Sequence, residues 1–510
     1  MTPEEYKLAS LRYDLWKLRA KGLIEKIPHS RRYRLLSHGY QICLVLGFVV
    51  LDIVSEIVSR IISLFGLERW AKCFKATKKM ARMSAYNRFM DSDAIAELNR
   101  GVLSAPELRE RLGVSPSTLM RMVRESGTGI LRIGRGRATQ YGLRQTWPNL
   151  EGPRFPLIRI SESGAAVSAG ELITLAAHQT VWMPMGTVAD GLPAELVDAR
   201  PSGFLGRLFA AVHADLRLPP LLSDWSDHHI LLAMSRRGEG LPGNLIVGEE
   251  SFARWQGIEL VSRSREDYPA LARATIAGHP PGSSAGGERP KFGALVGNQH
   301  MLIKFVGRGG VGDMAARRWC DLLILEGIAL QTVASQGISA ANSSVVETPD
   351  YWFLESERFD RLGLRGRTAV ISLAAVHDNL ADPWARAAVA LKEAGRLSVE
   401  DTRRLCWLDA FGALIANTDR HQYSILFFSE GFRLRIAPAF DQVPMLYAPT
   451  GDGQVPPREF MLPHATSNTL DVWEHARDAA RQFWTQGSDD TRLSDDARLF
   501  CASNMKLFTK

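Results

Sequence analysis

Two aspartates separated by the length of one β-hairpin restrict the fold of this chain more than any other feature. Asp419 lies in the polar stretch Ala416-Asn-Thr-Asp-Arg-His421, and Asp441 ends the run Leu434-Arg-Ile-Ala-Pro-Ala-Phe-Asp. The two are 22 residues apart, about what one hairpin requires to bring both carboxylates to one cleft. A loop aspartate can accept the proton of an attacking hydroxyl, and a second can hold Mg²⁺ on phosphates. Either aspartate alone would be interpreted as a turn-capping residue.

A glycine-containing loop and two strand-like runs precede these aspartates. Residues 283–291 are Ser-Ser-Ala-Gly-Gly-Glu-Arg-Pro-Lys, and the run Met301-Leu-Ile-Lys304-Phe follows. Glycines let backbone amides approach phosphate oxygens, and a strand-borne lysine neutralises the charge. A helix is predicted from Met314 to Gln331, and its Glu326 can orient Lys304, although a helix-surface glutamate is the preferred interpretation. The run beginning at Tyr351 predicts a strand that ends in a polar turn, where a two-lobed nucleotide site offers backbone groups to adenine.

The charge is distributed unevenly along the chain. Residues 1–150 contain 26 Lys+Arg and 13 Asp+Glu, whereas residues 151–510 contain 36 and 42. A front part of charge +13 beside a body of charge −6 predicts a polyanionic partner for the front part, nucleic acid before membrane. A merely soluble basic surface is the alternative.

The segment from Tyr86 to Arg144 predicts a winged helix-turn-helix. Ser104 is a candidate N-cap for a short helix that ends at Gly113, and Ser115 is a candidate N-cap for a second helix with Pro116 at its first position. After that second helix, two strand-like runs flank glycines and arginines, as in a wing. The residues expected to face DNA are Ser117, Thr118, Arg121 and Arg124 on the second helix and Arg135 and Arg137 in the wing. A winged helix that binds protein only is the alternative.

The remaining N-terminal residues give weaker signals. Residues 1–40 resemble a fragment of a winged helix with a basic, hairpin-like stretch, and a basic connector follows after residue 72. The apolar stretch Ile42–Leu67 carries Asp52, Glu56 and Arg60 at intervals of four, so an amphipathic helix is preferred to a membrane span. The five cysteines are scattered without a CxxC pair, and no secretory signal opens the chain, which together favour a reducing cytoplasm.

The order of motifs resembles the HipA family of serine/threonine kinase toxins, specifically its longer members with their own N-terminal helix-turn-helix. The motifs are Ser-x-x-Gly-x-x-x-Lys ending at Lys291, Ile-Lys-Phe at Lys304, Glu-Arg-Phe-Asp-Arg from Glu357, Asn-x-Asp-Arg-His at Asp419 and Ala-Pro-x-x-Asp at Asp441. The resemblance covers about residue 201 to the C-terminus. It implies a protein-kinase-like two-lobed fold, ATP with Mg²⁺, and phosphorylation of a protein hydroxyl.

The resemblance also implies roles for individual residues. Asp419 would be the catalytic base, Asp441 a metal ligand, Lys304 the phosphate-binding lysine and Ser284 a site of autophosphorylation. The phosphate loop would consist of Gly286, Gly287, Glu288, Arg289, Pro290 and Lys291, and the adenine hinge of Glu357, Arg358 and Phe359. His421 is grouped with the ATP-binding residues and interpreted as structural, since it has no partner ligands in sequence.

One residue departs from the family pattern. The motif continues Asp-Arg-His-x-x-Asn, with the asparagine as a second metal ligand, but this chain has Ser424 there. A serine hydroxyl is shorter than an amide and a poorer metal ligand. Two hypotheses follow: an active serine/threonine kinase toxin with a DNA-binding domain, or a DNA-binding transcription regulator whose pseudokinase domain senses nucleotide.

These observations predict an α+β protein: a kinase-like two-lobed domain of the HipA type preceded by α-rich winged-helix modules. The expected partners are DNA and a protein substrate, with an antitoxin and a second copy of the chain left open and no membrane. The predicted divisions are 1–40, the winged-helix-like fragment; 41–85, the amphipathic helix and connector; 86–145, the DNA-binding domain; 146–275, an α/β subdomain; 276–365, the nucleotide-binding lobe; and 366–510, the helical catalytic lobe.

Overall fold

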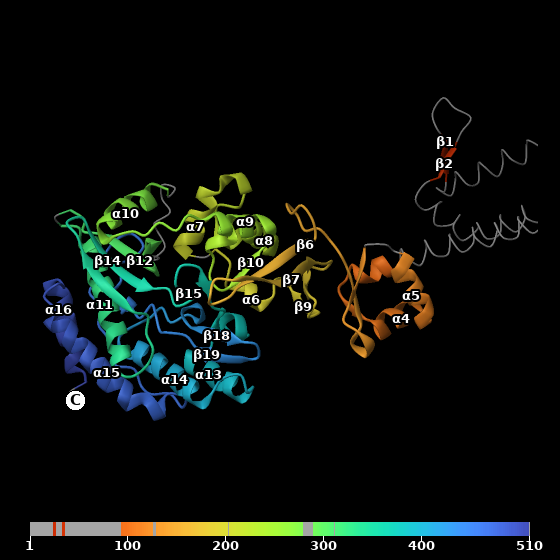
Figure 1. Ribbon diagram of the computed structural model, residues 1–510. Coiled ribbons are helices and arrows are strands. Elements are labelled where there is room, and N and C mark those ends of the chain that lie inside the picture. The colour runs from red at the N-terminus through yellow and green to blue at the C-terminus, as the bar shows by residue number, and fades with distance from the viewer. Residues whose placement is uncertain are drawn as a thin grey trace, which may run out of the picture. The chain divides into compact units, whose positions relative to one another are not determined.

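The computed structural model describes residues 24–26, 33–35, 93–125, 129–201, 203–278, 289–310 and 312–508. The chain divides into two compact units, Met1–Leu143 and Arg144–Lys510. The two units are described separately below, and Figure 1 labels their elements.

The first unit combines short helices with a small antiparallel sheet. After a helical segment at residues 93–98, its elements are β3 (Leu103–Ser104), α4 (Ala105–Leu112), α5 (Pro116–Glu125), β4 (Ile130–Ile133) and β5 (Gln140–Leu143), and the sheet order is β3-β5-β4. Leu108, Leu119, Met122 and Tyr141 form its buried core. A separate pair, β1 (Ile24–Lys26) and β2 (Tyr33–Leu35), is antiparallel. The predicted basic, hairpin-like stretch begins at Ile27, so β2 falls within it and β1 directly precedes it.

Local signals in the sequence explain where α4 and α5 begin and end. The Ser104 side chain accepts from the Glu107 amide while the Glu107 carboxylate accepts from the Ser104 amide, which forms a complete capping box. Helix α4 ends at Gly113, whose φ of 63° favours glycine. The Thr118 amide donates to Ser115 Oγ (3.2 Å) at the start of α5. The two predicted helix starts are therefore confirmed.

The second unit begins with a mixed subdomain built on a five-stranded sheet of order β10-β6-β7-β8-β9. The strands are β6 (Arg154–Ile160), β7 (Ala166–Thr174), β8 (Gln179–Met183), β9 (Thr187–Asp190) and β10 (Leu245–Val247). The helices are α6 (Ala194–Val197), α7 (Gly203–Val212), α8 (Asp227–Arg237), α9 (Glu249–Gly257) and α10 (Tyr268–Ala277). Trp147, Leu157, Trp182 and Leu231 share its core.

A four-stranded antiparallel sheet of order β11-β12-β14-β13 follows, with a helix on each face. The strands are β11 (Lys291–Val296), β12 (Gln299–Gly307), β13 (Ser343–Glu347) and β14 (Tyr351–Glu357). Side chains alternate along these strands: Phe305 and Phe353 pack with Tyr268 of α10, whereas Val306 and Leu354 pack in the core of α11 (Met314–Ser335). This lobe is green to teal in Figure 1.

The C-terminal lobe is mainly helical. Its helices are α12 (Leu373–Val376), α13 (Trp384–Glu393), α14 (Val399–Leu414), α15 (Leu470–Asp489) and α16 (Asp495–Lys506), and its strands are β15 (Arg361–Leu362), β16 (Gly366–Arg367), β17 (Val370–Ser372), β18 (Leu426–Glu430) and β19 (Arg433–Ile436). Strands β18 and β19 form the predicted hairpin between Asp419 and Asp441. Figure 1 shows α13, α14 and α15 running below that hairpin.

The architecture is therefore α+β, with a sheet-rich lobe and a helical lobe in the second unit. Among the described residues, none of the helices has the length and apolar character needed to cross a bilayer. The amphipathic helix predicted at residues 42–67 lies outside the described residues.

Candidate functional site

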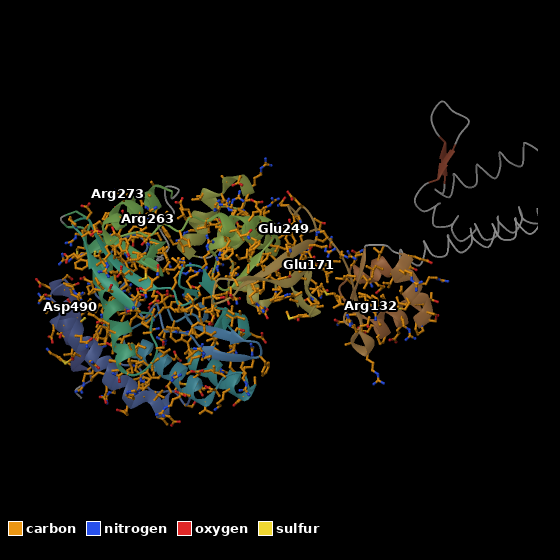
Figure 2. All side chains as sticks on the ribbon, viewed as in Figure 1. Arg132, Glu171, Glu249, Arg263, Arg273 and Asp490 are labelled. Atoms are coloured by element: carbon orange, nitrogen blue, oxygen red, sulfur yellow. The ribbon has the colours of Figure 1, made fainter. Side chains whose placement is uncertain are left out.

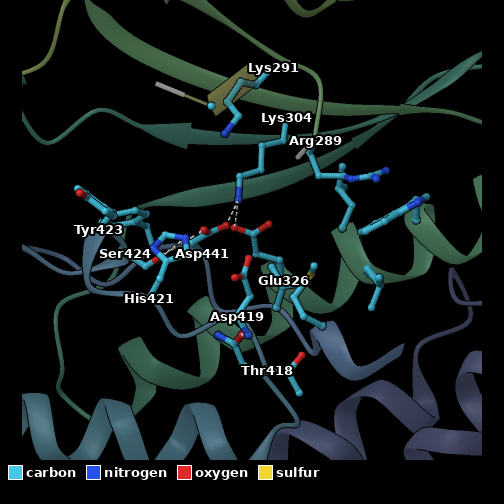
Figure 3. Close-up of a pocket in the computed structure, with 18 of the residues that line it drawn as sticks. Arg289, Lys291, Lys304, Glu326, Thr418, Asp419, His421, Tyr423, Ser424 and Asp441 are labelled. Carbon is cyan, nitrogen blue, oxygen red and sulfur yellow. Dashed lines mark hydrogen bonds and ion pairs between the residues drawn. The ribbon is translucent and has the colours of Figure 1, made fainter. Parts of the chain in front are cut away.

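A lysine held by two carboxylates lies at the centre of the candidate site. Lys304 Nζ donates to Glu326 Oε1 and to Asp441 Oδ1, both at 2.6 Å. The three residues come from β12, from α11 and from the segment after β19. Figure 3 shows the lysine pointing down from the sheet toward both carboxylates. The structure thus brings together two groups, Lys304 and Asp441, that are 137 residues apart.

The register of the sheet explains why Lys304 faces this way. Lys304 stands opposite Lys291 on β11 and Leu354 on β14, so it shares the face that packs on α11. Glu326 lies in the buried part of α11 and is 4% exposed. The expectation that Glu326 is a helix-surface residue is therefore wrong, because both faces of α11 are covered. Burial of the Glu326 carboxylate is tolerated because it pairs with Lys304.

The three charges shift one another's pKa values. Burial opposes the charge on Lys304, but Asp441 and Glu326 raise the pKa of its ammonium above the ordinary range. Burial raises the pKa of Glu326, and the nearby lysine counters it only in part. At Asp441, desolvation is outweighed by Lys304, which lowers the pKa to about 2. The cluster therefore keeps a positive lysine beside an ionised Asp441.

Asp419 lies in a loop that is fixed by its neighbours. Its amide donates to Asn417 Oδ1 (3.0 Å), and the next residue, Arg420, donates from Nε to Asp409 Oδ1 of α14 (3.2 Å). The loop begins at Ala416, whose φ of 59° lies in the left-handed region, a conformation that costs free energy in a non-glycine residue. Asp419 therefore lines the pocket from a loop that α14 positions.

Ser424 occupies a buried place beside Asp441. It is 2% exposed, and its Oγ lies 3.2 Å from His421 Nδ1 and 3.5 Å from Asp441 Oδ2. Asp441 has a φ of 58°, so its backbone, like that of Ala416, is held in a strained conformation at the pocket. His421 also accepts from Trp384 Nε1 through its carbonyl oxygen (3.1 Å), so α13 helps to hold the backbone here.

These side chains surround one pocket of about 770 Å³ (Figure 3). Of the predicted ATP-binding and metal residues, Arg289, Lys291, Lys304, His421, Ser424 and Asp441 line it together with Asp419. The Arg289 guanidinium lies 3.0 Å from the centre of the Trp319 ring, and burial lowers its pKa to about 9. Ser284, Gly286, Gly287 and Glu288 lie outside the described residues.

The other predicted nucleotide-binding residues do not line this pocket. Pro290 directly precedes β11, and its carbonyl accepts from the Phe305 amide. Glu357 ends β14, and Arg358 pairs with Asp360. Phe359 packs against Phe440, which does line the pocket, with ring centres 6.0 Å apart. Their role as an adenine hinge stays a prediction.

The sequence analysis missed that the mixed subdomain contributes residues to this pocket. Asp198 and Arg200, between α6 and α7, line the same pocket. Arg200 Nη2 donates to the Tyr423 hydroxyl (2.8 Å), and Asp198 accepts from Ser372 Oγ (2.6 Å). Arg200 and Tyr423 are 223 residues apart. Arg200 lies outside the quoted motifs, and Tyr423 fills an unspecified position of Asp-Arg-His-x-x-Asn. Only the tertiary structure reveals them.

The residues predicted to face DNA occupy the outer side of the first unit. Leu119 and Met122 of α5 are buried, whereas Ser117 and Arg124 are exposed and Thr118 and Arg121 are partly exposed. Arg135 and Arg137 are exposed in the turn between β4 and β5. Arg132 on β4, labelled in Figure 2, adds a further exposed guanidinium that the prediction did not include.

Comparisons with known proteins identify relatives for most of the second unit. The family model described as "YjjJ-like toxin, middle domain" matches residues 151–256, and that described as "HipA-like C-terminal domain" matches residues 283–498. The curated protein Toxin YjjJ of Escherichia coli (strain K12) is 34% identical over 427 residues, which cover 79% of this chain and 94% of that protein.

Two solved structures resemble the chain more distantly. One is the Shewanella oneidensis MR-1 toxin–antitoxin complex of HipA, HipB and operator DNA, with 15% identity and a TM-score of 0.46 over 69% of this chain and 95% of that chain. The other is the Helicobacter pylori proinflammatory kinase CtkA, with 11% identity and a TM-score of 0.27 over 45% and 91%. Because the sequence similarity to Toxin YjjJ extends over most of both proteins, this chain belongs to the HipA family of toxins.

Proposed function

We propose that this protein is an ATP- and Mg²⁺-dependent serine/threonine protein kinase whose activity makes it a toxin in the bacterial cytoplasm. The observation that carries the proposal is the convergence of Lys304, Glu326, Asp441 and Asp419 on one pocket. A lysine oriented by a helix carboxylate, with separate aspartates for the hydroxyl and for the metal, is the arrangement that phosphoryl transfer to a hydroxyl requires.

The donor atoms at the pocket fit a magnesium–nucleotide complex. The Asp441 carboxylate and the Ser424 hydroxyl offer oxygen ligands, which Mg²⁺ prefers. Within the ranges that the structure describes, no group of three or more His, Cys, Asp or Glu side chains could hold a metal by itself. Mg²⁺ usually keeps few protein ligands and shares phosphate oxygens, so we expect the metal to bind together with the nucleotide.

In this proposal each residue has one task. Bound ATP supplies the phosphoryl group, and Mg²⁺ neutralises its charge. Asp419 accepts the proton of the substrate hydroxyl. Lys304 contributes a fixed positive charge to the phosphates, and Glu326 keeps that ammonium in place from a buried site. Arg420 and Asn417 hold the Asp419 loop in position.

The proposal is tested by incubating the purified protein with γ-labelled ATP and Mg²⁺. We expect label on a protein hydroxyl with the wild type, and at least about 100-fold less with Asp419→Ala, because the general base is lost. Nucleotide affinity should survive, since Asp419 is assigned to the hydroxyl. Equal transfer by wild type and Asp419→Ala would rule out this role.

Ser424 supports a second candidate function. Its buried hydroxyl already lies within hydrogen-bond distance of His421, so it is a weaker metal ligand than the family's asparagine. A nucleotide-sensing pseudokinase attached to a DNA-binding module is therefore the alternative. Nucleotide binding without any transfer by the wild type would favour it.

We further propose that the first unit binds DNA through α5 and the β4–β5 turn. Helix α5 buries Leu119 and Met122 and leaves Arg124 exposed, as a helix entering a major groove would. The exposed arginines Arg135 and Arg137 sit in the adjacent turn and can contact phosphates. An antitoxin that restrains the kinase is also part of this proposal, because Toxin YjjJ carries a toxin's name.

A further inference from the structure

A second, smaller pocket lies where the mixed subdomain meets the segment after β14. It measures about 180 Å³. Four arginines line it, Arg358, Arg361, Arg365 and Arg367, together with His300 of β12. Glu239, Gly240 and Trp255 close it from the mixed subdomain. None of these residues lines the larger pocket described above.

Two carboxylates lie at this pocket, and each already accepts from an arginine. Asp360 accepts from Arg358 Nε (2.9 Å) and Nη2 (2.8 Å) and from Arg361 Nη1 (2.8 Å). Glu239 Oε1 accepts from Arg254 Nε (2.8 Å), outside the pocket. Its Oε2 is buried and has no hydrogen-bond partner among the described residues. With Arg254 included, five guanidinium groups lie at or beside the pocket, and three of them pair with its two carboxylates.

Arg365 and Arg367 use uncharged partners instead. Arg365 donates to the carbonyl oxygens of Trp255 and Ile258, both at 2.9 Å. Arg367 is 4% exposed and donates from Nη2 to the Glu239 carbonyl oxygen. Its Nη1 is buried and finds no hydrogen-bond partner among the described residues. Carbonyl groups satisfy donors but carry no net charge, so Asp360 and Glu239 compensate the positive charge here only in part.

Burial makes this excess charge unfavourable. Desolvation lowers the pKa of Arg367 to about 10 and holds the pKa of Arg361 well below its ordinary value. Guanidinium groups keep their proton in proteins, so these directions indicate stored electrostatic cost and not neutral arginines. A bound anion would relieve that cost.

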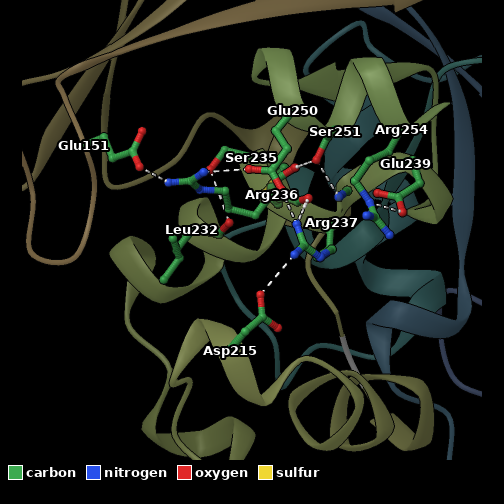
Figure 4. Close-up of polar contacts among 12 residues, drawn as sticks. Glu151, Asp215, Leu232, Ser235, Arg236, Arg237, Glu239, Glu250, Ser251 and Arg254 are labelled. Carbon is green, nitrogen blue, oxygen red and sulfur yellow. Dashed lines mark hydrogen bonds and ion pairs between the residues drawn. The ribbon is translucent and has the colours of Figure 1, made fainter. Parts of the chain in front are cut away.

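In a nearby cluster of the same subdomain, carboxylates balance the charge of the arginines. Arg236 pairs with Glu250 (2.6 Å) and also with Glu151, and Arg237 pairs with Glu250 and with Asp215 (3.0 Å). Figure 4 shows these contacts. Two arginines there have three carboxylates, so the excess of arginines at the small pocket is a property of that pocket and not of the subdomain.

We propose that the small pocket binds a phosphate group, free or at the end of a phosphate monoester. Planar guanidinium groups bind phosphate oxygens through paired, charge-assisted hydrogen bonds. The five arginines exceed the two carboxylates by three, so a doubly negative phosphate would offset most of the excess charge. The site lies at the contact between β12, the segment after β14 and the mixed subdomain, so its occupancy would strengthen the packing of these parts.

The test is calorimetric titration of the full chain at constant ionic strength with two probes, inorganic phosphate and O-phosphoserine. We expect binding of at least one probe, weakened about tenfold or more by Arg365→Gln and by Arg367→Gln. Arg365 is only partly buried, so its variant keeps the test valid if Arg367→Gln does not fold. Binding of both probes points to free phosphate, and binding of phosphoserine alone points to a phosphorylated side chain.

Two further variants distinguish phosphate binding at the small pocket from binding at other basic sites. Arg236→Gln, in the balanced cluster, should leave phosphate binding within about twofold of the wild type. Lys291→Gln removes a cation of the larger pocket, so it reports any phosphate that binds there instead. The proposal fails if neither probe binds, or if binding is lost in Lys291→Gln and retained in Arg365→Gln and Arg367→Gln. None of these outcomes depends on phosphoryl transfer, so the proposed kinase activity is tested separately.

Discussion

The two carboxylates that hold Lys304 differ in surroundings, and the difference decides what each can do. Glu326 is almost fully buried on α11, and its carboxylate accepts a hydrogen bond from the lysine. Asp441 is only partly buried and lines the open pocket. We infer that Glu326 is the permanent partner of the lysine, whereas Asp441 can exchange that contact for a metal ion.

A change at Ser424 tests how far the proposed metal site departs from the family pattern. We expect Ser424→Asn to lower the Mg²⁺ concentration for half-maximal phosphoryl transfer by about tenfold, because an amide oxygen reaches further and binds the metal better than the hydroxyl. The measurement is a Mg²⁺ titration of transfer at saturating ATP. The control is Ser429→Asn on β18, which lies outside the pocket and should leave the titration unchanged. Equal half-maximal concentrations in all three proteins would exclude a ligand role for this position.

The pKa of Asp360 allows a prediction of how the free energy of unfolding depends on pH. Although burial opposes its charge, Arg358 and Arg361 hold the pKa of Asp360 well below its ordinary value of 3.8. A carboxyl with a lowered pKa in the folded state stabilises the fold above pH 3.8 and loses that contribution as the pH falls further. The variant Asp360→Asn would leave buried arginines without their charged partner. We therefore expect it to lower the free energy of unfolding at pH 7 by about 3 kcal/mol.

The same variant should also make the free energy of unfolding depend less on pH in the acidic range. We expect the difference in unfolding free energy between wild type and Asp360→Asn, measured by urea denaturation from pH 6 downward, to shrink once the pH is below 3.8. Asp490→Asn is a suitable comparison, since Asp490 pairs with Arg492 in a more exposed setting. A difference that stays constant across this range would show that the Asp360 carboxylate is not responsible.

At the scale of elements, the sequence predicted much of the site because several elements carry local signals. Helices α4 and α5 have Ser104 and Ser115 as caps, and the β18–β19 hairpin has a turn at Gly431. Glu326 was misjudged because α11 is covered on all sides, and periodicity alone does not show what covers a helix. Arg200 was missed because its role depends on a contact with Tyr423 across 223 residues.

Helix α5 provides the test of DNA binding. We expect Arg121→Ala and Arg124→Ala each to weaken binding to duplex DNA and to reduce the slope of log affinity against log salt by about one unit for each lost phosphate contact. The measurement is fluorescence anisotropy across a salt series. Arg100→Ala is the matched control, because Arg100 is exposed in the same unit but pairs with Glu97. If affinity and slope stay at wild-type values in both α5 variants, DNA does not bind through this helix.

At the scale of the whole molecule, the described pocket residues all come from the second unit. They run from Asp198 to Met445, and this unit has hydrophobic cores of its own around Trp384, Trp182 and Phe353. The first unit has a separate core around Leu108 and Tyr141. Separate cores mean that each unit can fold without burying surface against the other.

Removing residues 1–143 should therefore separate the two proposed activities. We expect the chain from Arg144 to Lys510 to keep nucleotide affinity and phosphoryl transfer within about twofold, because no described pocket residue is removed. Duplex DNA affinity should fall to the level of the double variant Arg121→Ala/Arg124→Ala in the full chain, or below it. Circular dichroism of the shortened chain confirms that it folds. If the folded fragment loses transfer by more than tenfold, the first unit contributes to catalysis, and the division of labour between a DNA-binding unit and a kinase unit must be abandoned.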